Sequence, residues 1–104
     1  MQNEKLEKLV NFHYKNPLIY QLFKKYTFEK IKEGKKSYSA EAVLNRVRWD
    51  EDVKTDGSEY KIPNAMKPFY SRLFCQKHQR YYDFFEKRKS ICDELRYNYV
   101  YEKL

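Results

Sequence analysis

The chain has 104 residues, enough for one domain, and its two glycines are too few for a phosphate-cradling loop, whose backbone needs glycine to approach a ligand closely. The formal charge of +7, from 22 lysines and arginines against 15 acidic residues, favours anionic partners: nucleic acid, an anionic membrane surface or an acidic protein. A merely soluble, lysine-rich surface explains the same charge, because composition does not show whether the cations cluster.

Neither a metal-binding pattern nor a membrane segment is evident in the sequence. Cys75 and Cys92 are the only cysteines, and the two histidines, His13 and His78, are too scattered to complete a zinc site. We therefore expect reduced thiols and no cofactor, with a disulfide only in an oxidising compartment. No apolar run approaches a membrane span, and the first ten residues lack the apolar region of a signal peptide, so we expect a cytoplasmic protein with no membrane partner.

Periodicity and end signals predict two helices at the start of the chain. The first covers residues 3–14, where leucines recur at helical spacing. The second begins at Asn16-Pro17, because asparagine caps helices and proline suits the first helical position. It runs to about residue 33 and ends at Gly34, since glycine adopts the left-handed conformation that often closes a helix.

A third helix and a β-hairpin follow. Ser39 caps the helix, its apolar residues recur every three or four positions, and Trp49 closes the buried stripe. The hairpin covers residues 53–62 and turns at Asp56-Gly57, a pair that tolerates positive φ at both central positions. An isolated hairpin is marginally stable, so we expect it to lie on the helices.

The second half adds two more helices, one from residue 64 or 67 to 78 and one over 79–99. We expect a mainly α single domain over residues 1–104, with an N-terminal helix (1–15), a core (16–90) and a C-terminal helix end and tail (91–104). The helix-helix-hairpin-helix order of the core resembles a winged-helix or helix-turn-helix-like module. The predicted buried residues are Leu22, Phe23, Tyr26, Val43, Leu44, Val47, Trp49, Phe69, Leu73, Phe74, Phe84 and Phe85.

The helix after the hairpin is the candidate for reading DNA. Its polar strip holds Lys67, Ser71, Cys75 and His78 and is flanked by Arg72. A recognition helix presents a few such side chains to base edges, and the candidates here are Lys67, Ser71, Arg72 and Cys75. The predicted phosphate contacts are Arg46, Arg48, Lys54 and Lys61. Two observations oppose this interpretation: the hairpin replaces the usual tight turn, and the acidic residues around it would repel phosphates if they lie on the same face.

Two other classes of function compete with DNA binding. An enzyme is not expected, because the sequence lacks a catalytic triad, a nucleophile elbow, a Walker loop and H-E-x-x-H. A protein-interaction module, such as a phage-type inhibitor of a host machine with an acidic or nucleoprotein partner, suits a chain with 11 tyrosines and many arginines. The tyrosines at 97, 99 and 101 indicate a docked tail or a homodimer contact.

Residues 16–90 resemble a group of short proteins without an assigned activity from bacterial genomes, prophages and phages. The resemblance lies in the helix over residues 16–32 and in four motifs. These are Arg46-Val47-Arg48-Trp49, Tyr60-Lys61-Ile62 with Asn64, Tyr70-Ser71-Arg72-Leu73-Phe74, and Tyr82-Asp83-Phe84-Phe85-Glu86 with Arg88. The resemblance implies a phage or mobile-element setting and a cytoplasmic protein, and it transfers no activity.

Overall fold

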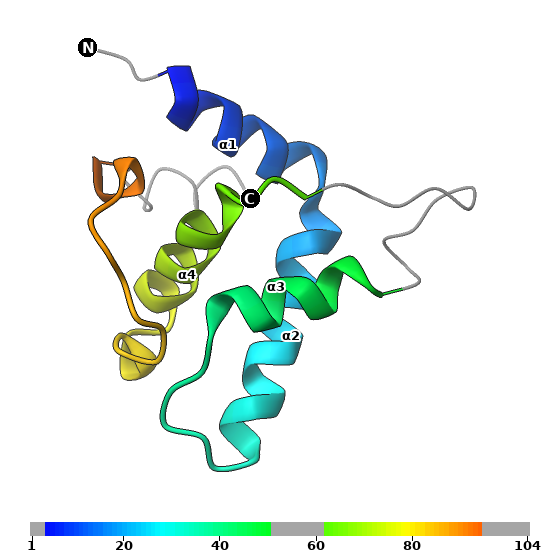
Figure 1. Ribbon diagram of the computed structural model, residues 1–104, viewed down its shortest axis with the longest axis vertical. Coiled ribbons are helices and arrows are strands. Elements are labelled where there is room, and N and C mark those ends of the chain that lie inside the picture. Colours follow the sequence, from blue (N-terminus) through cyan, green and yellow to red (C-terminus); the bar gives the residue numbers. More distant parts are fainter. Residues whose placement is uncertain (1–3, 51–61, 95–104) are drawn as a thin grey trace.

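The computed structural model of the chain describes residues 4–50 and 62–94. Within them the chain forms a compact all-α domain with four α-helices, two short 3-10 helices and no strand (Figure 1). The elements are α1 (Glu4–Lys15), α2 (Pro17–Lys32), α3 (Ala40–Arg48), α4 (Met66–Lys77), η1 (Gln79–Tyr81) and η2 (Ile91–Glu94). The helical class is confirmed. The predicted hairpin lies outside the described residues, apart from its last residue, Ile62, so it has no support from the structure.

The ends of α2 follow the signals in the sequence with one difference. Pro17 occupies the first helical position, and Gly34 closes the helix with φ +92° while its N–H donates to Ile31 O at 3.0 Å. The side chain of Asn16 does not cap α2. Its Nδ2 donates backwards to Phe12 O at 2.9 Å, so Asn16 closes α1 instead.

Helix α3 starts as predicted, with the Ala42 N–H donating to Ser39 Oγ at 3.1 Å. Its apolar stripe is buried, but the expected burial of Trp49 is wrong, because this side chain is 70% exposed. Trp49 follows the buried Val47 by two residues, which is about 200° around a helix of 3.6 residues per turn. The indole therefore leaves the domain on the side opposite the core.

Helix α4 is the central element of the domain. Figure 1 shows it between the other three helices and the segment that returns through η1 and η2. Its rings pack against those of its neighbours: Phe74 lies 5.2 Å from Phe28 of α2, and Phe69 lies 5.5 Å from His13 of α1, between ring centroids. The buried residues of α4 are Met66, Phe69, Tyr70, Ser71, Arg72, Leu73, Phe74 and Cys75. Of the residues of α4, only Lys67, Gln76 and Lys77 are exposed, so the helix offers few side chains to a partner.

The continuous helix predicted over residues 79–99 is wrong for residues 82–90. The chain leaves η1, crosses α4 in an irregular path and forms η2. Two neighbouring phenylalanines, Phe84 and Phe85, are both buried, and the Tyr38 N–H donates to Phe84 O at 3.2 Å. Phe84 O therefore accepts from a distant segment of the same chain in place of a residue in its own helix. Packing on α4 thus overrides the helical spacing of the sequence. No helix in the described residues is long and apolar enough to cross a membrane.

Candidate nucleic-acid interface

Two of the residues predicted to contact DNA from α4, Ser71 and Arg72, are buried at 3% and 6% exposure. Ser71 Oγ donates to Pro68 O at 3.1 Å, inside its own helix. The expectation that they form an exposed strip is therefore wrong, because residues 82–93 cover that side of α4. Lys67, one turn nearer the start of the helix, is exposed as predicted.

Arg72 connects α4 to the returning segment. Its Nε donates to Asp93 Oδ1 at 2.6 Å, its Nη1 donates to Pro68 O at 3.1 Å, and its Nη2 donates to Arg88 O. The Ser90 N–H and the Arg72 guanidinium hold the pKa of Asp93 below its usual value, because both stabilise the carboxylate. The Arg72 guanidinium thus donates its hydrogen bonds to groups of the protein itself.

Arg48 also makes structural contacts. Its guanidinium donates to Asn45 Oδ1 at 2.7 Å, to Ile62 O at 2.8 Å and to Asn64 Oδ1 at 2.7 Å. These bonds fix the end of α3 to the segment that leads into α4. An arginine with three acceptors in place has few donors left for a phosphate.

Arg46 lies two residues before Arg48 on α3, on another side of the helix, and contacts α2. Its Nη1 is 2.9 Å from Glu29 Oε2, and its guanidinium carbon is 4.1 Å from the centroid of the Tyr26 ring. The Tyr26 hydroxyl donates to Asp50, and this bond with the nearby carboxylate raises the pKa of Tyr26. The other two predicted phosphate contacts, Lys54 and Lys61, lie outside the described residues.

A cavity of about 750 Å³ opens where the start of α3, the start of α4 and residues 86–90 meet. We call it the α3–α4 cleft. It is lined by Ser37, Tyr38, Ser39, Ala40, Glu41, Lys67, Pro68, Ser71, Arg72, Glu86, Arg88, Lys89 and Ser90. The structure thus brings together three of the predicted residues, Lys67, Ser71 and Arg72, and places Arg46 and Arg48 at the far end of α3.

Two cations of the cleft, Arg88 and Lys89, are not among the site residues predicted from the sequence. Arg88 lies 3.8 Å from Glu86, and both side chains are more than four-fifths exposed, so this ion pair is weak. Within the described part of the chain, neither Lys67 nor Lys89 forms an ion pair. The run of charges over 86–89 is the available signal in the sequence, but a long helix over 79–99 would place these charges on its surface and give them no cavity.

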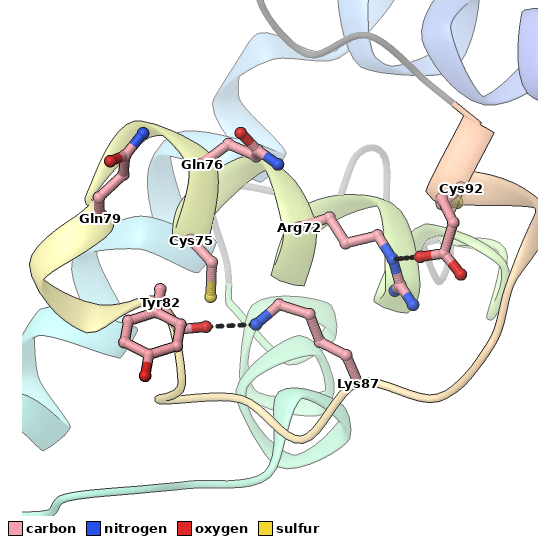
Figure 2. A pocket seen from close by; sticks show the side chains of 8 residues that line it. Arg72, Cys75, Gln76, Gln79, Tyr82, Lys87 and Cys92 are labelled. Atoms are coloured by element: carbon pink, nitrogen blue, oxygen red, sulfur yellow. Dashed lines mark hydrogen bonds and ion pairs between the residues drawn. The ribbon is translucent and has the colours of Figure 1, made fainter.

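A second cavity, of about 460 Å³, lies on the other side of Arg72. We call it the Tyr82 pocket. It is lined by Arg72, Cys75, Gln76, Gln79, Tyr82, Lys87, Cys92 and Asp93. Figure 2 shows Tyr82 and Cys75 on one side, Arg72 and Cys92 on the other, and Lys87 reaching toward the backbone of Tyr82, to which it donates. Both cysteines are free thiols and both are buried.

The described residues contain no group of three or more histidines, cysteines or carboxylates that could hold a metal ion. The chain matches no known protein-family model, no curated protein and no solved structure. The resemblance to phage and prophage proteins therefore stays a prediction.

Proposed function

We propose that this protein binds nucleic acid without catalysing a reaction, and that the α3–α4 cleft contacts the backbone phosphates. DNA is the first partner to test. One observation supports the proposal: Lys67, Arg88 and Lys89 come from two separate segments and converge on one cavity at the start of a helix. Such a convergence goes beyond a net charge of +7, which a scattered set of lysines would also give.

The start of α3 adds a second source of positive potential to these side chains. The first amides of a helix have no acceptor within the helix, and the helix dipole places a partial positive charge there. Ser39 Oγ accepts a hydrogen bond from the Ala42 N–H. The backbone amides of Ala40 and Glu41 point out of the same end of α3, toward the cleft. Phosphate is a common ligand of such a helix end when cations stand nearby.

The acidic residues of the cleft set a limit on its affinity. Glu41 lies in the first turn of α3, and Glu86 faces Arg88. A phosphate that enters the cleft would compete with Glu86 for Arg88. Because the Arg88–Glu86 ion pair is exposed and weak, breaking it costs little free energy. Binding should therefore be modest and strongly dependent on salt, as contact with a phosphate backbone is.

Titration of labelled duplex and single-stranded DNA across a salt series tests the proposal. The informative variant is Lys67→Glu with Lys89→Glu. The matched control is Lys8→Glu with Lys32→Glu, two exposed lysines outside the cleft that change the net charge by the same amount. We expect the cleft variant to bind at least about tenfold more weakly at low salt. For each phosphate that the variant no longer neutralises, the salt slope should be shallower by about 0.9 with duplex and about 0.7 with single-stranded DNA.

The control variant should bind with an affinity much closer to that of the wild type. An equal decrease in both variants would mean that overall charge, and not the cleft, drives binding. If neither nucleic acid binds even at low salt, the proposal is wrong.

A protein-interaction module is the second candidate, and the exposed Trp49 favours it. Trp49 is 70% exposed and follows Arg46 on α3, and Trp and Arg are enriched among residues that dominate protein interfaces. For this function, Trp49→Ala should abolish capture of a protein partner while the Lys67 and Lys89 changes leave it intact. Competition with free DNA separates the two candidates, because DNA would not displace a partner held at Trp49.

A further inference from the structure

We propose that the Tyr82 pocket takes one unpaired nucleobase of a single-stranded nucleic acid whose phosphates lie in the α3–α4 cleft. This inference rests on the proposed function and narrows it to single strands. It assigns a role to a cavity that the phosphate contacts do not use.

The two cavities are neighbours that share one wall. Arg72 lines both, and the segment 86–89 runs between them. From that segment Glu86, Arg88 and Lys89 line the cleft, whereas Lys87 lines the pocket. A strand whose backbone follows the cleft would therefore pass the entrance of the pocket.

The shape of the domain favours an extruded base over a duplex. Reading a duplex requires a protruding element, usually a helix, that enters a groove and meets base edges. The helix expected to do this, α4, is buried except at Lys67, Gln76 and Lys77. A cavity instead receives a group that leaves its stack, as single-stranded and flipped bases do. A volume of about 460 Å³ falls in the range of small-ligand pockets.

The groups that line the pocket suit a base. Tyr82 is 67% exposed, so its ring is open to stacking against a π-face of any base. Gln76 and Gln79 are exposed and carry amides, each offering both donors and an acceptor to a base edge. Buried Cys75 and Cys92 form a less polar floor beneath them.

Arg72 and Lys87 are held in place by the protein. Arg72 is fixed by Asp93 and two backbone carbonyls, and Lys87 donates to Tyr82 O (Figure 2). Arg72 at least therefore has a defined position before a base enters, which lowers the entropy cost of binding.

The test compares two labelled 12-nucleotide strands with the same phosphates: oligo-dT and a strand of abasic residues. We expect the wild-type protein to bind oligo-dT about tenfold more tightly than the abasic strand, since stacking of one base on an aromatic ring supplies an effect of about this size. Tyr82→Ala should remove the difference, and Tyr82→Phe should retain it. Gln79→Ala should reduce it, whereas Gln21→Ala, a change at an exposed glutamine on α2, should not.

The outcomes separate this inference from the proposed function. If both strands bind equally and binding weakens with salt, the pocket proposal is overturned and phosphate contact in the cleft stands. If neither strand binds, both are overturned. Binding of free deoxythymidine monophosphate as tightly as oligo-dT would also overturn it, because the pocket would then be a nucleotide site independent of the cleft. Circular dichroism confirms that each variant is folded.

Discussion

The Arg72 guanidinium donates to the Asp93 carboxylate at 2.6 Å, joining the central helix to the last element that the structure describes. The two residues are 21 positions apart, and Arg72 also donates to the backbone carbonyls of Pro68 and Arg88. Because Arg72 lines both cavities, this network fixes the wall between them.

Arg72→Met should lower the free energy of unfolding by about 2 kcal/mol, because charged hydrogen bonds in a buried setting contribute about that much. Arg72→Lys should recover little of this stability. A lysine ammonium lacks the planar fork of the guanidinium and cannot reach all three acceptors. Asp93→Asn should cost less than Arg72→Met, because Asp93 is half exposed. Urea unfolding measures all three, and a stability equal to wild type in Arg72→Met would contradict the structural role.

Arg48 and Lys67 should behave in opposite ways. Arg48→Ala should destabilise the protein by about 1–2 kcal/mol, because it removes the bonds from α3 to Ile62 O and Asn64 Oδ1. The folded variant should bind DNA nearly as well as wild type. Lys67→Ala should leave stability within about 0.5 kcal/mol and weaken DNA binding. Thermal denaturation combined with titration distinguishes the two, and a stable, binding-deficient Arg48→Ala would reverse the assignment.

His13 should make stability depend on pH. Its ring is buried among Tyr14, Tyr20, Phe69 and Tyr70, and within the described residues neither ring nitrogen has a hydrogen-bond partner. Burial lowers the pKa of His13 to about 4 from its usual 6.5. The unfolded chain therefore binds a proton at a higher pH than the folded one. The free energy of unfolding keeps its full value above pH 6.5 and falls as the pH drops toward 4. The total decrease is about 3 kcal/mol.

His13→Leu should remove most of this dependence and raise stability at pH 5. The pKa of His78 is also lowered, by burial and by the nearby Lys24 and Lys77, so this residue adds a smaller effect of the same sign. His78→Leu serves as the comparison. Urea titrations at pH 5 and pH 7.5 are sufficient, and an unchanged difference between the two pH values in His13→Leu would show that another group titrates.

Gly34 should tolerate asparagine better than alanine. Its φ of +92° lies in the left-handed region, and a Cβ placed there meets no atom within 4 Å. The cost of Gly34→Ala is therefore a backbone cost of about 1 kcal/mol, and Gly34→Asn should cost less because asparagine visits this region more readily. Thermal unfolding of the two variants checks the order.

The boundaries of α2 and the start of α3 could be predicted because their signals are local. Pro17, Gly34 and Ser39 each act on backbone groups within a few residues, so their effects can be read from the sequence alone. The burial of Ser71 and Arg72 could not be predicted in the same way. It depends on the segment after residue 82, which packs on α4. That segment is irregular, so helical spacing in the sequence does not predict its path.

The candidate site likewise contains residues that local signals predict and residues that depend on a distant segment. The position of Lys67 on α4 predicts its exposure, whereas Arg88 and Lys89 reach the cleft only because residues 82–90 are not helical. The residue type of Trp49 favours the core, although its angle around α3 already places it opposite Val47.

The most direct test of the phosphate-binding cleft is to map where a short DNA strand contacts the folded protein by backbone amide chemical shifts. The structure predicts the largest changes at Ala40 and Glu41, at Lys67 and around Ser90, with smaller changes at the end of α3. Changes gathered around Arg46 and Trp49, with none at the start of α3, would contradict the assignment of the α3–α4 cleft as the nucleic-acid interface.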